Sequence, residues 1–97
     1  MKFIGGNPDA VTLDVLRYVG NLLGQDVCWF LRGAFHFKLG NEWTVALSPE
    51  SAGRFRVDTC HLTASRATKW CRATDRSRLD LLIREAADSA FTMNLSL

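Results

Sequence analysis

The stretch that decides the fold is DVCWFLRGAFHFKLGNEWTVALSPESAGRFRVDTCHL, residues 26–62. It is rich in aromatic and β-branched residues, and the short segments GA, GN and SPESAG interrupt it. Apolar runs broken by turn-forming residues are typical of strands joined by tight connections. We therefore predict four strands, near residues 26–32, 35–39, 42–48 and 54–61, that form an antiparallel meander.

The last three of these strands alternate between apolar and polar residues. Their apolar positions are Phe35, Phe37, Leu39, Trp43, Val45, Leu47, Phe55 and Val57. Successive side chains of a strand point to opposite faces, so this alternation predicts one apolar and one polar sheet face.

The loop between the second and third strands sets their register. A loop of residues 39–41 keeps the apolar residues of both strands on one face and places Phe37 opposite Trp43. On the polar face this register predicts two rows: His36 with Thr44 and Asp58, and Lys38 with Glu42 and Cys60.

Helices are expected on both sides of this stretch. Asn7 is a good N-cap and Pro8 suits the first helical turn, and apolar residues then recur at helical spacing until Gly24. A second helix is predicted from about Asp75 to Ala90, and the alternating tail FTMNLSL, residues 91–97, is predicted as a short strand. The sequence thus predicts a single α+β domain over residues 1–97, with both helices on the apolar face of the sheet.

Positive charge is concentrated in one short segment of a nearly neutral chain. The net charge of the 97 residues is only +2. Five cations stand in residues 66–78 against the single acid Asp75: Arg66, Lys69, Arg72, Arg76 and Arg78. If residues 65–74 were helical, Trp70 would point away from the cations, which would leave a basic ridge able to contact phosphates without stacking bases. Non-specific nucleic-acid binding by these five residues is therefore one hypothesis.

The first strand supports a different hypothesis. The segment VCWFLR, residues 27–32, is apolar on both faces and would form the edge of the meander. An apolar edge is normally paired or covered, and the tail strand of the same chain or of a second copy is a candidate to pair with it. The alternative is that the N-terminal segment MKFIGG, residues 1–6, folds over this edge. The predicted partner-binding residues are Cys28, Trp29, Phe30, Phe91, Met93 and Leu95. Our main functional prediction is a non-enzymatic module that acts through protein association, as a homodimer or with a protein partner.

Other kinds of site have weaker support. Cys28, Cys60, His61 and Cys71 lack the close ligand pairs of zinc sites, so no metal or other cofactor is predicted. The row of His36, Thr44 and Asp58 lacks an obvious pocket, so no catalysis is predicted. A small apolar ligand between sheet and helices is a third functional hypothesis.

The sequence also carries a prediction of location. The N-terminal residues show no signal peptide, and no apolar run is long enough to span a membrane. Three cysteines, an odd number, are typical of thiols in a reducing compartment. A cytoplasmic protein without membrane contact is expected.

Overall fold

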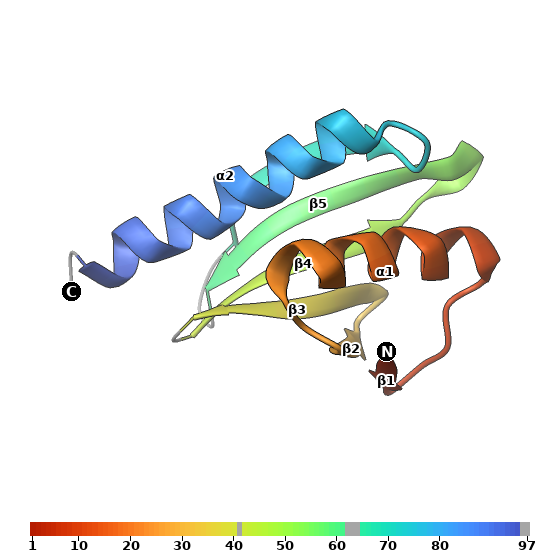
Figure 1. Ribbon diagram of the computed structural model, residues 1–97, viewed down its shortest axis with the longest axis horizontal. Helices are drawn as coiled ribbons and strands as arrows, with labels where there is room; N and C mark the ends of the chain where they lie inside the picture. The colour runs from red at the N-terminus through yellow and green to blue at the C-terminus, as the bar shows by residue number, and fades with distance from the viewer. Residues whose placement is uncertain (41, 62–64, 96–97) are drawn as a thin grey trace.

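The computed structural model describes residues 1–40, 42–61 and 65–95 (Figure 1). It contains two α-helices, one 3₁₀ turn and a six-stranded sheet whose strands lie in chain order from β1 to β6. The elements are β1 (Lys2–Ile4), α1 (Ala10–Leu23), β2 (Val27–Leu31), β3 (Ala34–Gly40), β4 (Trp43–Pro49), η1 (Ser51–Gly53), β5 (Arg54–His61), β6 (Ser65–Arg72) and α2 (Arg76–Leu95). The predicted α+β class is confirmed.

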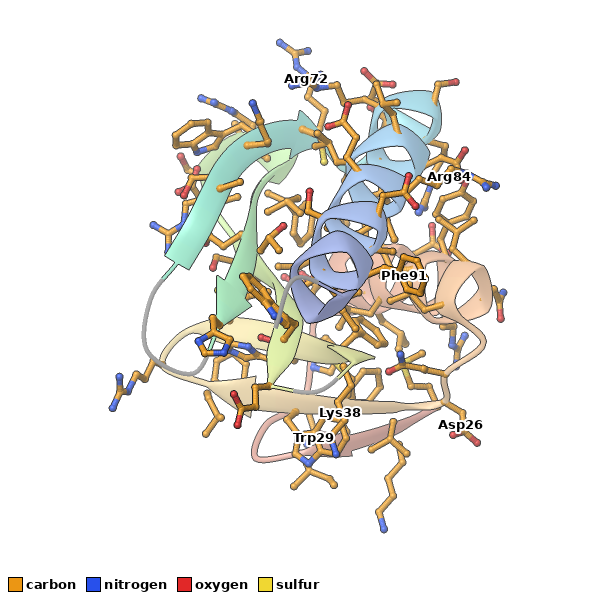
Figure 2. All side chains as sticks on the ribbon, turned by 90° about the vertical axis from the view of Figure 1, so that its left-hand side faces the viewer. Asp26, Trp29, Lys38, Arg72, Arg84 and Phe91 are labelled. Atoms are coloured by element: carbon orange, nitrogen blue, oxygen red, sulfur yellow. The ribbon has the colours of Figure 1, made fainter. Side chains whose placement is uncertain are left out.

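Both helices lie on the same side of the sheet (Figures 1 and 2). Between them and the sheet lies a core in which Leu16, Phe37, Val45, Leu47 and Leu79 have no accessible surface. None of the described helices and strands covers the other side of the sheet, and we call it the open face (Figure 2). Its residues in the described strands are Trp29, Leu31, Ala34, His36, Lys38, Thr44, Ala46, Ser48, Arg54, Arg56, Asp58, Cys60, Thr68, Trp70 and Arg72.

The meander has five strands, so the prediction of four was wrong. The additional strand is β6, in the segment for which the basic ridge assumed a helix. It pairs antiparallel with β5 from Arg54↔Arg72 to Cys60↔Ser65. Without β6, the backbone groups of β5 would form an unpaired edge, and the β-branched Thr68 and the aromatic Trp70 both favour a strand.

The first strand of the meander is not an edge of the sheet, so the prediction that residues 27–32 form an edge was wrong. The N-terminal β1 pairs with β2 in parallel, from Lys2↔Val27 to Ile4↔Trp29. The chain leaves β1 through Gly5 and Gly6, which pass close to the backbone and ring of Phe30. The edge of β2 that faces away from β3 is therefore paired with β1.

Over residues 91–95 the predicted tail strand does not form, because α2 continues to Leu95, and residues 96–97 lie outside the described residues. The sequence contains no glycine or proline after Ala90 to end the helix. Adding one residue to an existing helix costs less than starting a new strand, and the edge that the tail was expected to pair with is occupied by β1. The prediction that the helix ends near Ala90 was therefore wrong.

The register of the meander differs from the prediction by two residues. Phe37 lies opposite Val45 rather than Trp43, because an irregularity at Leu39 shifts the pairing between Lys38 and Gly40. The loop residue Asn41 lies outside the described residues. Because the shift is by two residues, each side chain keeps its predicted face. The polar rows become His36 with Ala46 and Asp58, and Lys38 with Thr44 and Cys60.

Helix α1 begins slightly later than predicted. Its N-cap is Asp9 rather than Asn7, and the Asp9 carboxylate accepts a hydrogen bond of 2.8 Å from the backbone N–H of Thr12. Its end at Gly24 is confirmed.

Gly5 offers a test of how β1 docks. A β-carbon on Gly5 would lie 2.7 Å from the carbonyl oxygen of Phe30, whereas one on Gly53 would meet open space. Both glycines have positive φ, +93° and +69°, so alanine is strained at either position. We expect Gly53→Ala to lower the unfolding free energy by about 1 kcal/mol and Gly5→Ala by about 3 kcal/mol in urea denaturation. Equal losses would contradict the close approach of β1 to β2.

Candidate functional site

The open face contains a hollow of about 770 Å³. Its floor is made of small residues, since Ala34, Ala46 and Ser48 are buried although neither α1 nor α2 covers them. The hollow is lined by Leu31, Arg32, Ala34, His36, Glu42, Thr44, Ala46, Ser48, Arg56, Asp58, Cys60, His61, Thr68 and Trp70. Small residues in the middle and larger ones around them make this face receptive to a flat group.

Two large apolar side chains border the hollow and remain exposed. Leu31 is 60% exposed and Trp70 is 45% exposed. Another tryptophan, Trp29, is half-buried on the same face, and the ammonium group of Lys38 lies 5.6 Å from its ring centroid. Exposed aromatic side chains beside cations are the combination that single-stranded nucleic acids bind.

Arginines lie around Trp70 on β5 and β6. Arg56 is its direct cross-strand neighbour, and two pairs further along the strands, on the same face, Arg54 stands opposite Arg72. Like charges directly opposite each other destabilise a sheet. Within residues 1–40, 42–61 and 65–95, no ion pair compensates either Arg54 or Arg72. The pair is therefore suited to bind an anion.

Arg32 adds a further cation at the border of the hollow. It lies in the two-residue turn between β2 and β3 with a φ of +52°, a conformation that costs a non-glycine residue about 1 kcal/mol or more. Asparagine or glycine would fit this turn better. A long cation in a strained position next to a hollow is consistent with a role in binding.

The helices do not share this excess of positive charge. Helix α1 contains one acid and one base, and α2 contains three of each. In Figure 2, Arg84 and Phe91 project on the side of the helices, Arg72 lies at the upper end of the sheet, and Trp29 and Lys38 lie at its lower end. Positive charge is thus concentrated on the open face, along the length of the sheet.

A buried carboxylate orients one of these arginines. Asp58 is only 7% exposed and accepts two hydrogen bonds. One comes from Nε of Arg56 to Oδ2 at 2.9 Å, and the other comes from the hydroxyl of Thr68 to Oδ1 at 2.5 Å. Arg56 is consequently fixed on the open face by a group that cannot easily move.

The two histidines of the hollow make other contacts. Nδ1 of His36 lies 3.4 Å from the hydroxyl of Thr44, and Nε2 of His61 lies 3.1 Å from a carboxylate oxygen of Glu42. The hydrogen bonds of Asp58 go elsewhere, so the row of His36, Thr44 and Asp58 does not form a relay. Among the described residues, no three His, Cys, Asp or Glu side chains form a group that would hold a metal ion.

The structure separates the five cations of the basic segment. Arg72 lies on the open face, whereas Lys69 faces the helix side, where it lines a hollow with Glu85 and Asp88. Arg66 belongs to β6, but its side chain is outside the described part of the chain. Arg76 pairs with Asp14 at 2.6 Å beside the ring of Tyr18, and Nε of Arg78 donates to the carbonyl oxygen of Trp70 at 3.4 Å. The predicted ridge is therefore not a single surface.

The six residues predicted to bind a partner are also separated. Cys28 is buried in the core, Phe30 packs on Phe35 at a centroid distance of 4.6 Å, and Trp29 lies on the open face. Phe91 is 64% exposed on α2. Met93 and Leu95 belong to the same helix, and their side chains are not described.

The arginines of β5 and the position of Trp70 were missed by the sequence interpretation. Residues 65–72, SRATKWCR, also alternate with a period of two, which places Arg66, Thr68, Trp70 and Arg72 on one face of a strand. Together with Arg54 and Arg56, this alternation predicts a basic face that contains a tryptophan. The helical interpretation of the segment concealed it.

The pH dependence of stability tests the burial of Cys28. Burial raises the pKa of the Cys28 thiol to about 12, although a hydrogen bond with the backbone of His36 opposes the shift. In the unfolded chain a cysteine loses its proton near pH 8.5, so between about pH 9 and about pH 12 the folded state binds the extra proton and stability falls as pH rises. We expect a shallower fall for Cys28→Ala than for the wild type in urea denaturation at alkaline pH. Equal slopes would contradict this assignment.

Neither helix within the described residues combines the length and the apolar character needed to cross a membrane. No protein-family model, curated protein or solved structure matches the chain. Its function is therefore inferred from the geometry of the open face.

Proposed function

We propose that this protein is a non-enzymatic module that binds single-stranded nucleic acid on the open face of its sheet. The observation that carries the proposal is the exposed Trp70, which lies in register with Arg56 and next to the opposed pair of Arg54 and Arg72. A base can stack on the indole ring while the neighbouring guanidinium groups contact phosphates. The three cysteines are present as thiols, which suits a reducing compartment such as the cytoplasm.

The shape of the site favours a single strand over a duplex. Duplex DNA is read by an element that protrudes into a groove, whereas the open face is hollow and its tryptophans lie on the strands. Unpaired bases expose their rings and can stack on Trp70 and Trp29. Arg54 and Arg72 at one end and Lys38 at the other provide positive charge for the backbone that connects these bases (Figure 2).

Protein association has weaker support than it had from the sequence. The apolar edge that suggested it is paired with β1, and Cys28 and Phe30 contribute to the interior. The hypothesis of an apolar ligand between sheet and helices has likewise lost support, because Leu16, Phe37 and Leu47 fill that layer. The molar mass from light scattering at low and high salt distinguishes a dimer, in which a second copy covers the open face, from a monomer whose open face is available to other partners.

Fluorescence anisotropy with labelled oligothymidine and oligouridine tests the proposed function. About four phosphate contacts, from Arg32, Lys38, Arg54 and Arg72, predict a log–log slope of affinity against salt near −3. Both the DNA and the RNA oligonucleotide are expected to bind, because stacking and phosphate contacts are common to both. No salt-dependent binding of either oligonucleotide would overturn the proposal.

Replacement of Trp70 separates stacking from general attraction. We expect Trp70→Ala to weaken binding about tenfold or more, since stacking of one base contributes about 1–3 kcal/mol. Leu81, which is 49% exposed on α2, offers a matched control, and Leu81→Ala should leave affinity unchanged. Equal affinities of the Trp70→Ala variant and the wild type would contradict the stacking of a base on Trp70.

A further inference from the structure

We infer that the open face prefers guanine, recognised by the guanidinium group of Arg56 beside a base stacked on Trp70. This inference rests on the proposed function and goes beyond it, because phosphate contacts and stacking alone do not distinguish bases. It depends on how Asp58 and Thr68 hold Arg56.

Arg56 is fixed at one side of its guanidinium group and available at the other. Its Nε donates to Asp58, and its terminal nitrogens Nη1 and Nη2 have no hydrogen bond to any part of the chain that the structure describes. The side chain is 45% exposed, whereas that of Asp58 is 10% exposed and receives a second hydrogen bond from Thr68. The two free nitrogens therefore form a fork with a limited range of orientations.

On the base edge that carries N7 in the purines, the fork matches guanine better than the other bases. Guanine presents two neighbouring acceptors, O6 and N7, and an arginine that donates to both makes the commonest specific contact to a base. Adenine presents N7 beside an amino group, which would leave one donor of Arg56 facing another donor. Thymine and uracil offer O4 alone on that edge, and cytosine offers an amino donor.

Asp58 also makes Arg56 a weaker phosphate ligand than its neighbours. A carboxylate 2.9 Å from the guanidinium group offsets much of its charge, while the directional donors at the terminal nitrogens remain. Arg54 and Arg72 have no such acid among the described residues and keep their full charge. The geometry thus assigns phosphate attraction to Arg54 and Arg72 and base selection to Arg56.

The position of Arg56 relative to Trp70 completes the argument. The two residues are direct partners across β5 and β6, so their side chains leave the same face of neighbouring strands. A base stacked on the indole ring would have its edge within reach of the neighbouring guanidinium group. One base can therefore satisfy both residues.

Anisotropy titrations with a set of short labelled oligonucleotides test the preference. Each oligonucleotide is thymidine throughout, with a single central guanine, adenine, cytosine or thymine, and a uridine set extends the test to RNA. We expect the guanine oligonucleotide to bind about tenfold more tightly than the other three, as one bidentate contact discriminates by about 1–3 kcal/mol. Replacing the guanine by 7-deazaguanine, which lacks the N7 acceptor, should remove most of this advantage.

Three variants connect the preference to the geometry. Arg56→Lys keeps the positive charge without the planar fork and is expected to prefer guanine less strongly than the wild type does. Thr68→Val removes the hydroxyl that supports Asp58 and should reduce the guanine preference, whereas Thr68→Ser should retain it. The selectivity ratio is the readout, because a general loss of stability would not change one oligonucleotide more than another.

The outcomes distinguish this inference from the proposed function. Equal binding of the four oligonucleotides by the wild type, with a normal salt dependence, would overturn guanine recognition and leave single-strand binding intact. An undiminished preference in Arg56→Lys would overturn the assignment to Arg56. Absence of binding to every oligonucleotide would overturn both proposals.

Discussion

Arg54→Glu is expected to make the protein more stable and at the same time to weaken its binding of single-stranded nucleic acid. Arg54 and Arg72 face each other across β5 and β6, so the substitution converts a repulsive pair into an attractive one. Opposite charges in such a pair contribute up to about 1 kcal/mol, and the unfolding free energy should rise by about that amount. Affinity for oligothymidine should fall about 30-fold at low salt, because a loss of attraction and a gain of repulsion of about 1 kcal/mol each act on the same phosphate.

A charge-matched variant on the helices provides the control. Arg84→Glu makes the same change in net charge on α2, on the side of the sheet that the helices cover, away from the open face (Figure 2). Arg84 forms an ion pair with Asp80 at 3.1 Å, so its reversal should lower stability slightly and reduce affinity far less than 30-fold. Similar losses of affinity in the two variants would show that only net charge matters, which would contradict an interface on the open face.

Phe37→Ala is expected to have the largest effect on stability. Phe37 has no accessible surface and lies in β3 beneath α1, where one of its ring atoms would be 3.6 Å from a β-carbon on Gly20. Truncation of a buried phenylalanine costs about 3–5 kcal/mol, a large part of the stability of a small domain. We expect urea denaturation to show a loss of this size or an unfolded variant.

The matched control for this prediction is Phe91→Ala. Phe91 is 64% exposed on α2, so its truncation should change the unfolding free energy by less than about 0.5 kcal/mol. If residues 91–97 formed the strand expected from their alternation, Phe91 would pack against the sheet and its truncation would be costly. A loss near that of Phe37→Ala would therefore contradict the helical C-terminus.

The sequence predicted which face of the sheet each side chain occupies better than it predicted which residues pair across strands and which strands form the edges. Period-two alternation placed Phe35, Phe37, Val45 and Leu47 correctly in the core, since a two-residue change of register leaves every side chain on its face. The exact partners depended on an irregularity at Leu39, which pairing between strands determines and local sequence does not.

The candidate site was only partly predictable for a related reason. Residues 65–72 fit a helix or a strand by composition, and the need of β5 for a partner decides between them. The strand turns Trp70 from an interior residue into an exposed neighbour of Arg56. Similarly, the short β1 at the N-terminus covers the edge that suggested dimerisation, and its three residues give no periodicity from which a strand could be predicted.

The most direct test of the account is an NMR titration of the ¹⁵N-labelled protein with a ten-residue oligothymidine. The account predicts that the largest shifts occur at the indole N–H of Trp70, the Nε–H of Arg56 and the amides of neighbouring residues in β5 and β6. Amides of α1 and of α2 around Arg84 should change little. Shifts confined to the helices, or a spectrum that does not change at low salt, would contradict binding on the open face.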